Sequence, residues 1–193
     1  MRFGGWNVNV FKNMPQKVAS AMAKLQEQLL GAEYKEIVYL GSQLVNGINH
    51  AVLAEQTILS GKDTTNAVLL IFNEKSNDID ATLTEIRTIA ETGDPMGGAV
   101  VDIKTDIPED AMEVWKARFE GFVGADISPI ALLATQLVNG TNYVFLAEQS
   151  PVVPNPPKKV VLITLNNFND EIKVNDVLLG GSPDPGLGYA FTW

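Results

Sequence analysis

One fourteen-residue stretch occurs twice in this chain. Residues 43–56 read QLVNGINHAVLAEQ and residues 136–149 read QLVNGTNYVFLAEQ, so ten of the fourteen positions are identical at an offset of 93 residues. Asn-Gly between β-prone residues is a strong signal for a two-residue hairpin turn, because both central residues of that turn need a positive φ. The stretch therefore predicts two β-hairpins, with Asn46-Gly47 and Asn139-Gly140 at their tips.

The offset of 93 residues continues without a gap on both sides of the hairpins. Glycine and proline positions show it most clearly: Gly4-Gly5 corresponds to Gly97-Gly98, Pro15 to Pro108 and Gly31 to Gly124. Each half is long enough to hold a hydrophobic core of its own. We therefore predict two copies of one domain, formed by residues 1–93 and 94–193.

Within each copy the pattern predicts a strand, a helix and four further strands. Apolar side chains recur at helical spacing at Val18, Met22, Leu25 and Leu29, and the equivalent face holds Ala111, Trp115, Arg118 and Phe122. Pro15 lies in the first turn of the first helix and Gly31 follows its end. Continuous apolar runs at 67–72 and 160–165 predict buried strands, and Trp115 is predicted to lie in the core. One helix against an antiparallel sheet is an α+β architecture.

Composition excludes several classes of protein. The chain has no cysteine, so disulfides, thiolate nucleophiles and cysteine-based metal sites are excluded. The net charge of −9 disfavours nucleic acid and anionic membranes as partners. No apolar run approaches the roughly 20 residues of a membrane-spanning helix. The first residues lack the apolar core of a signal peptide, which predicts a cytoplasmic protein if Met1 is the natural start.

The chain offers few groups for enzyme chemistry. Its single histidine, His50, corresponds to Tyr143 in the second copy, so a site common to both copies cannot depend on it. Glu55 and Glu148 occur in both copies, but they lie among apolar residues at strand positions. No catalytic triad order, phosphate-binding loop or metal-ligand spacing is present in the sequence. We therefore predict a protein that is not an enzyme and holds no metal or cofactor.

The hairpin motif resembles one protein family. Gln-x-Val-x-Gly, followed in the second copy by Thr141-Asn142-Tyr143, resembles the first inhibitory hairpin of the cystatins, which inhibit papain-like cysteine peptidases. The Gly-Gly pair before the first strand, the proline near the helix start and the absence of cysteine resemble the stefin-like branch. The resemblance implies two cystatin-like domains, each an antiparallel β-sheet wrapped on one α-helix.

The resemblance also implies a function, namely reversible, non-covalent inhibition of a papain-like cysteine peptidase. In cystatins a Gly-Gly trunk, the first hairpin tip and a second hairpin together form a wedge that blocks the active-site cleft. The implied peptidase-binding residues are Gly4, Gly5, Gln43, Leu44, Val45, Asn46 and Gly47 in the first copy, and Gly97, Gly98, Gln136, Leu137, Val138, Asn139 and Gly140 in the second, together with Phe168 in its second loop.

The second loops depart from the family pattern. Many cystatins have Pro-Trp there, whereas residues 73–78 and 166–170 contain one aromatic, Phe168. The second copy is therefore predicted to be the inhibitory one. The alternative is a non-inhibitory protein-binding or structural module with a cystatin-like fold.

The last ten residues allow two interpretations. Residues 184–188 resemble 94–98, and Tyr189, Phe191 and Trp193 then alternate with other residues. This segment is either a partial third copy of the opening strand or a hydrophobic C-terminus that lies against the nearest domain, and we favour the second interpretation.

Overall fold

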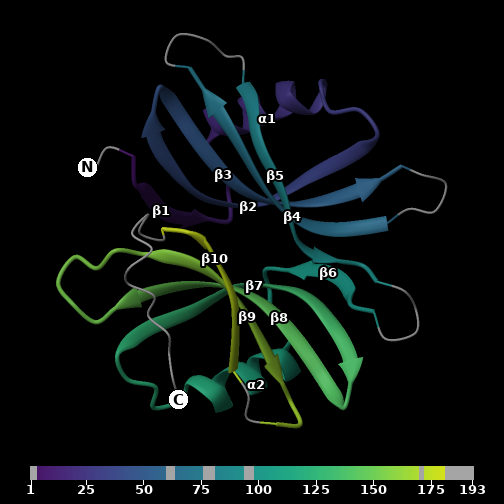
Figure 1. The fold of residues 1–193 in the computed structure, drawn as a ribbon, viewed down its shortest axis with the longest axis vertical. Helices are drawn as coiled ribbons and strands as arrows, with labels where there is room; N and C mark the ends of the chain where they lie inside the picture. Colours follow the sequence, from purple (N-terminus) through teal and green to yellow (C-terminus); the bar gives the residue numbers. More distant parts are fainter. Residues whose placement is uncertain (1–3, 60–63, 76–80, 94–97, 170–171, 181–193) are drawn as a thin grey trace.

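The computed structural model describes residues 4–59, 64–75, 81–93, 98–169 and 172–180. These residues form two five-stranded antiparallel sheets, each drawn from one half of the chain and each accompanied by one helix (Figure 1). The first half contains β1 (Trp6–Phe11), α1 (Gln16–Gln26), β2 (Ala32–Val45), β3 (Gly47–Ile58), β4 (Thr64–Glu74) and β5 (Ala81–Glu91). The second half contains β6 (Val100–Lys104), α2 (Glu109–Phe119), β7 (Ala125–Val138), β8 (Gly140–Pro151), β9 (Lys159–Asn166) and β10 (Ile172–Leu179).

The two sheets pack face to face around a shared core. In the first sheet the strand order is β1-β2-β3-β4-β5, and in the second it is β10-β9-β8-β7-β6. Buried leucines from both sheets meet in one hydrophobic cluster: Leu40, Leu53 and Leu69 with Leu133, Leu146 and Leu162. The sheets therefore form a sandwich whose centre is built from both halves of the chain.

Each helix covers the outer face of its own sheet, so that α1 and α2 lie on opposite sides of the sandwich (Figure 1). Met22 and Leu25 of α1 are buried against Leu70 and Phe72, as their spacing predicts. On α2 the predicted core residue Trp115 is buried, and its ring lies 5.0 Å from that of Phe145. Both helices are 11 residues long and end before the predicted positions.

The predicted fold class is wrong. We expected α+β domains, each with a sheet wrapped on one helix, whereas the described residues are mostly β, with 60% strand and 14% helix. The physical reason is that the central strands are buried on both faces. On β3, Val52 faces the helix and Leu53 faces the other sheet, and both are fully buried. A single short helix covers one face only, so the second sheet covers the other.

The two halves share the same strand register at their hairpins. Gln43 pairs with Asn49 in the first hairpin and Gln136 pairs with Asn142 in the second. Irregularities also recur at equivalent positions, between Tyr39 and Gly41 and between Leu132 and Ala134. Where the halves meet, the Lys12 ammonium donates to the backbone oxygen of its repeat equivalent, Thr105, at 3.4 Å. This contact fits an approximate two-fold relation between the halves.

The approximate two-fold relation sends the two hairpin tips in opposite directions. In Figure 1 the β2–β3 tip lies at the upper left and the β7–β8 tip at the lower right.

Among the described residues, neither helix is long and apolar enough to cross a membrane. Gly97 and the last ten residues, for which predictions were made, lie outside the described part of the chain.

Candidate protein-binding site at the hairpin ends

Both predicted hairpins are present, but their turns differ from the prediction. The last paired residues are Val45 with Gly47 and Val138 with Gly140, so a single asparagine lies between the paired residues of each hairpin. Gly47 and Gly140 have φ values of +98° and +88°. Among the described non-glycine residues only Asn155 has a positive φ, so Asn46 and Asn139 do not adopt the two-residue turn.

Each tip glycine lies directly against the end of the next strand along the chain, at Glu74 of β4 in the first half and at Phe168, just after β9, in the second. A Cβ atom on Gly47 would lie 2.6 Å from the Glu74 carbonyl oxygen. One on Gly140 would lie 2.7 Å from the Cβ atom of Phe168. Any side chain at these two positions would therefore displace the neighbouring loop. The first hairpin tip and the second loop, which the resemblance placed in one wedge, are in contact in both halves.

The N-terminal Gly-Gly segment joins this end in the first half. The Gly4 carbonyl oxygen accepts a hydrogen bond of 2.8 Å from the Gln43 side chain. The Gly4 amide lies 3.4 Å from the Leu44 carbonyl oxygen, and Gly5 is exposed. In the second half, Gly98 packs against Gly93, where an added Cβ would lie 2.8 Å from the Gly98 Cα.

Exposed apolar side chains distinguish the two hairpin ends. In the second half Leu137 is 78% exposed, Val138 45% and Phe168 70%. In the first half Val45 is 42% exposed and Leu44 is half-buried. We use the name apolar tip for Leu137, Val138 and Phe168. Because Phe168 lies beside Gly140, these three side chains belong to one end of the second sheet.

The motif glutamines are partly buried and hydrogen-bonded within their own sheets. Neither is among the exposed residues of its hairpin. The Gln43 side chain accepts a hydrogen bond of 2.9 Å from Asn49, and the Gln136 side chain accepts one of 3.2 Å from Asn142. Within each hairpin, the exposed residues of the predicted site are tip residues that follow the glutamine.

The sequence did not predict a cluster of buried polar side chains under α1. His50 Nδ1 lies 3.1 Å from the Tyr39 hydroxyl, and His50 Nε2 lies 3.1 Å from the Glu74 carboxylate. Lys17 of α1 forms an ion pair with the same carboxylate. Burial lowers the pKa of His50, partly offset by Glu74. Burial raises the pKa of Glu74, but hydrogen bonds from Lys17 and His50 outweigh it, so the net pKa is lowered.

A comparison of the two copies of the repeat could have revealed this buried polar cluster. Lys17, His50 and Glu74 of the first copy correspond to Asp110, Tyr143 and Asn167 of the second, so the three positions differ together. In the second half the Tyr143 hydroxyl donates to the Asp110 carboxylate at 3.1 Å instead. This arrangement raises the pKa of Tyr143, through burial first and then through the neighbouring carboxylate. His50 is closed off from solvent, which suits a structural role.

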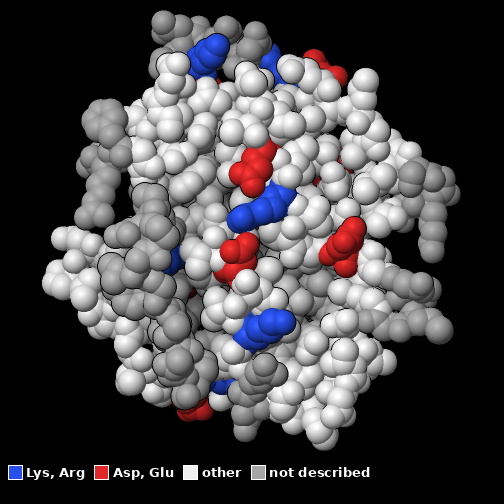
Figure 2. Space-filling model, in the orientation of Figure 1, with Lys and Arg blue, Asp and Glu red and all other residues white. Residues whose placement is uncertain are grey.

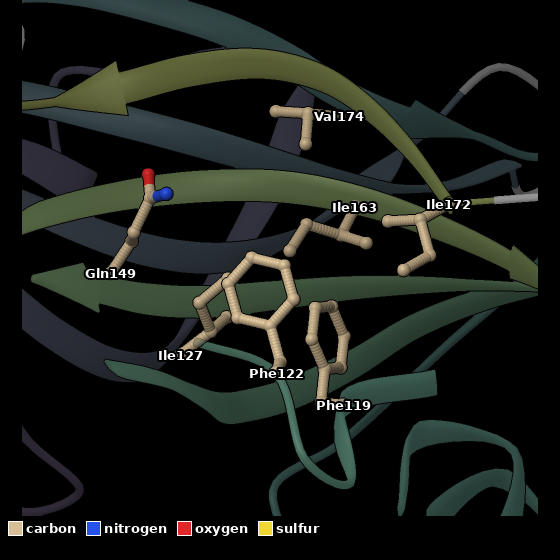
Figure 3. A pocket seen from close by; sticks show the side chains of 7 residues that line it. All are labelled: Phe119, Phe122, Ile127, Gln149, Ile163, Ile172 and Val174. Carbon is tan, nitrogen blue, oxygen red and sulfur yellow. The ribbon is translucent and has the colours of Figure 1, made fainter. Parts of the chain in front are cut away.

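The described part of the second half contains one small hollow. A hollow between the end of α2 and the outer face of the second sheet is lined by apolar side chains, including Phe119, Phe122 and Ile163 (Figure 3). Its volume of about 10 Å³ is comparable with that of a single water molecule. Within the described residues no group of three or more His, Asp or Glu side chains is arranged to hold a metal ion.

Comparison with known proteins adds no further constraint. No protein-family model matches this chain, and no curated protein matches it at a significant level. The face drawn in Figure 2 carries acidic and basic side chains side by side, without a broad area of one sign. The hairpin ends are therefore interpreted from their own geometry and from the motif that they contain.

Proposed function

We propose that this chain binds a protein partner through its hairpin ends, and that the partner is a papain-like cysteine peptidase which it inhibits reversibly. The observation that carries the proposal is the apolar tip, in which three exposed apolar side chains lie on a hairpin end and its neighbouring loop. Exposed apolar side chains that are held together in this way are typical of protein interaction sites. The Gln-x-Val-x-Gly motif supports the choice of peptidase.

The proposed contact is non-covalent and is stabilised by the removal of apolar side chains from water. Leu137 and Phe168 would lose their contact with water on entering a cleft, and buried aromatic anchors dominate many protein interfaces. The tip is also well ordered for such a contact. The Thr141 amide donates to the Asn167 side chain at 2.8 Å, so the hairpin and the loop that carries Phe168 are joined. Less conformational entropy is lost when such a surface binds.

A non-inhibitory binding module is the second candidate. One observation favours it, because the Gly4 carbonyl is hydrogen-bonded to Gln43 in the first half. A trunk held against its own hairpin is less able to lie along the subsites of a peptidase. In this case the hairpin ends bind a partner that is not a peptidase.

The two candidates are separated by titration of papain with the full chain. We expect micromolar chain to lower the hydrolysis of a fluorogenic peptide, and Phe168→Ala to weaken inhibition roughly thirty-fold, which corresponds to about 2 kcal/mol. Leu137→Asp should also weaken it strongly, whereas the matched change Leu44→Asp in the first half should have a small effect. Equal losses from Leu137→Asp and Leu44→Asp would mean that both ends inhibit.

The behaviour of the parent chain with papain tests the peptidase proposal itself. Binding to papain without inhibition would contradict the inhibitor proposal and also the second candidate, whose partner is not a peptidase. The absence of both binding and inhibition at micromolar chain would overturn the peptidase proposal. Circular dichroism of each variant checks that a loss of inhibition does not come from unfolding.

A further inference from the structure

Side-chain amides form a continuous chain of hydrogen bonds across the first sheet. The Asn73 side chain of β4 donates to Asn49 of β3 at 2.8 Å, and Asn49 donates to Gln43 of β2 at 2.9 Å. The Gln43 amide nitrogen then donates to the Gly4 carbonyl oxygen at 2.8 Å. Four segments of the first half are thus joined in a row at the hairpin end of the sheet.

The second sheet repeats this arrangement at the equivalent positions. The Asn166 side chain of β9 donates to Asn142 of β8 at 2.8 Å, and Asn142 donates to Gln136 of β7 at 3.2 Å. We call the two rows, Gln43–Asn49–Asn73 and Gln136–Asn142–Asn166, the amide relays. Each relay residue pairs with its neighbour across the strands, so the backbone register places the side chains opposite one another.

The relay of the second half continues into the loop that carries Phe168. The Asn166 side-chain oxygen accepts hydrogen bonds from the backbone amides of Phe168 at 2.7 Å and of Asn169 at 3.2 Å. The Asn166 amide nitrogen also lies 3.3 Å from the carbonyl oxygen of Asn139 at the hairpin tip. Asn166 is buried, so the loss of one of its hydrogen bonds would leave a polar atom that water cannot reach. The position of Phe168 is therefore connected to Gln136 through two asparagine side chains.

We propose that Gln43 and Gln136 are positioning residues, whose side chains hold the hairpin and its neighbouring segments as one rigid unit, while the exposed tip residues make the contact with the partner. This inference rests on the proposed function for its binding consequence. In the second half Gln136 acts through Asn142 and Asn166 on Phe168. In the first half Gln43 acts on the Gly4 segment directly.

The expected consequence is a change in the population of the binding-competent tip. Without the first member of the relay, Asn142 and Asn166 are less restrained, and the loop with Phe168 occupies its bound position for a smaller fraction of the time. The apparent affinity then falls by that fraction. Such a loss appears mainly in the association rate, whereas loss of a direct contact appears mainly in the dissociation rate.

The test compares Gln136→Leu with its exposed neighbour, Leu137→Ala, in the full chain. Hydrogen exchange measured by NMR reports on the amides of Phe168 and Asn169, and surface plasmon resonance with inactivated papain gives both rate constants. For Gln136→Leu we expect exchange at these two amides to become roughly three- to ten-fold faster, the range that the loss of one hydrogen bond implies, with a slower association rate. For Leu137→Ala we expect unchanged exchange and faster dissociation.

Gln136→Glu provides a conservative variant, because its carboxylate can still accept the hydrogen bond from Asn142. Exchange at Phe168 and Asn169 should therefore stay close to that of the parent chain. If Gln136→Leu leaves exchange unchanged and instead speeds dissociation as Leu137→Ala does, Gln136 is a contact residue and the inference is overturned. If papain does not bind the parent chain, the proposed function fails, but the exchange rates still decide whether the amide relay orders the loop.

Discussion

At the scale of single residues, His50 and Glu74 form a pair of buried ionisable side chains. Both are buried beneath α1, where the ammonium of Lys17 and the hydroxyl of Tyr39 also face them. The net pKa of each is lowered from its ordinary value. A lowered pKa in the folded state means that the unfolded chain binds protons more readily, so acid favours unfolding.

This gives a prediction for the pH dependence of stability. The contribution of His50 is fully present above about pH 6.5, its ordinary pKa, and is lost as the pH falls below that value. The contribution of Glu74 is lost at still lower pH, below its ordinary pKa of about 4.3. We expect the melting temperature of the parent chain to fall from pH 7 to pH 5 more steeply than that of His50→Gln. Parallel curves for the two proteins would contradict this.

The tip glycines allow a second prediction at this scale. Gly140 has a positive φ and touches the loop of Phe168, whereas Gly124 has a φ of +101° with no atom within 4 Å of an added Cβ. Gly124→Ala should therefore cost only the backbone strain, roughly 1–3 kcal/mol. Gly140→Ala should cost at least about 1 kcal/mol more, because the loop must also move. Urea unfolding of both variants measures the difference, and equal losses would show that the loop moves freely.

At the scale of elements, the sequence predicted the order of strands and helices better than their packing. The spacing of Met22 and Leu25 located the buried face of α1 correctly, because an amphipathic helix has one apolar side. The runs at 67–72 and 160–165 were also interpreted correctly as buried strands. Strands buried on both faces need a layer on each side, and these runs did not reveal that the second layer is the other sheet.

The candidate site was predictable to a similar extent. The positions of the hairpins followed from Asn-Gly, but the turn type did not, because only the glycine adopts a positive φ. The prediction that the motif glutamines belong to the contact surface stays a prediction, and the sequence did not reveal their hydrogen bonds to Asn49 and Asn142. Those bonds depend on which residues face one another across the strands, and this register was not part of the sequence prediction.

The shared core gives a prediction at the scale of elements and their layers. Leu40, Leu53 and Leu69 of the first sheet are covered by the second sheet, so residues 1–93 alone would expose them. We expect the isolated fragment to self-associate or to lack a cooperative unfolding transition, since an exposed apolar face of this kind promotes association. Light scattering and thermal unfolding of the fragment test this. A stable, monomeric fragment would show that each half folds independently.

At the scale of the whole molecule, the two halves are joined by more than their common core. Arg87 of β5 lies 3.6 Å from the Asp176 carboxylate of β10, and Lys12 forms an ion pair of 3.0 Å with Asp106. These pairs are largely exposed and contribute little to stability. Each pair joins residues at the boundary between the halves, whereas the shared core holds the two halves together.

The opposed directions of the two hairpin tips have a consequence for stoichiometry. A partner that occupies the β7–β8 end leaves the β2–β3 end on the far side of the sandwich uncovered (Figure 1). Under the proposed function, if the β2–β3 end also binds, a second molecule would lie on the opposite side of the sandwich from the first. Two sites on one compact partner cannot be engaged together, so any gain from avidity requires partners that are themselves clustered or immobilised.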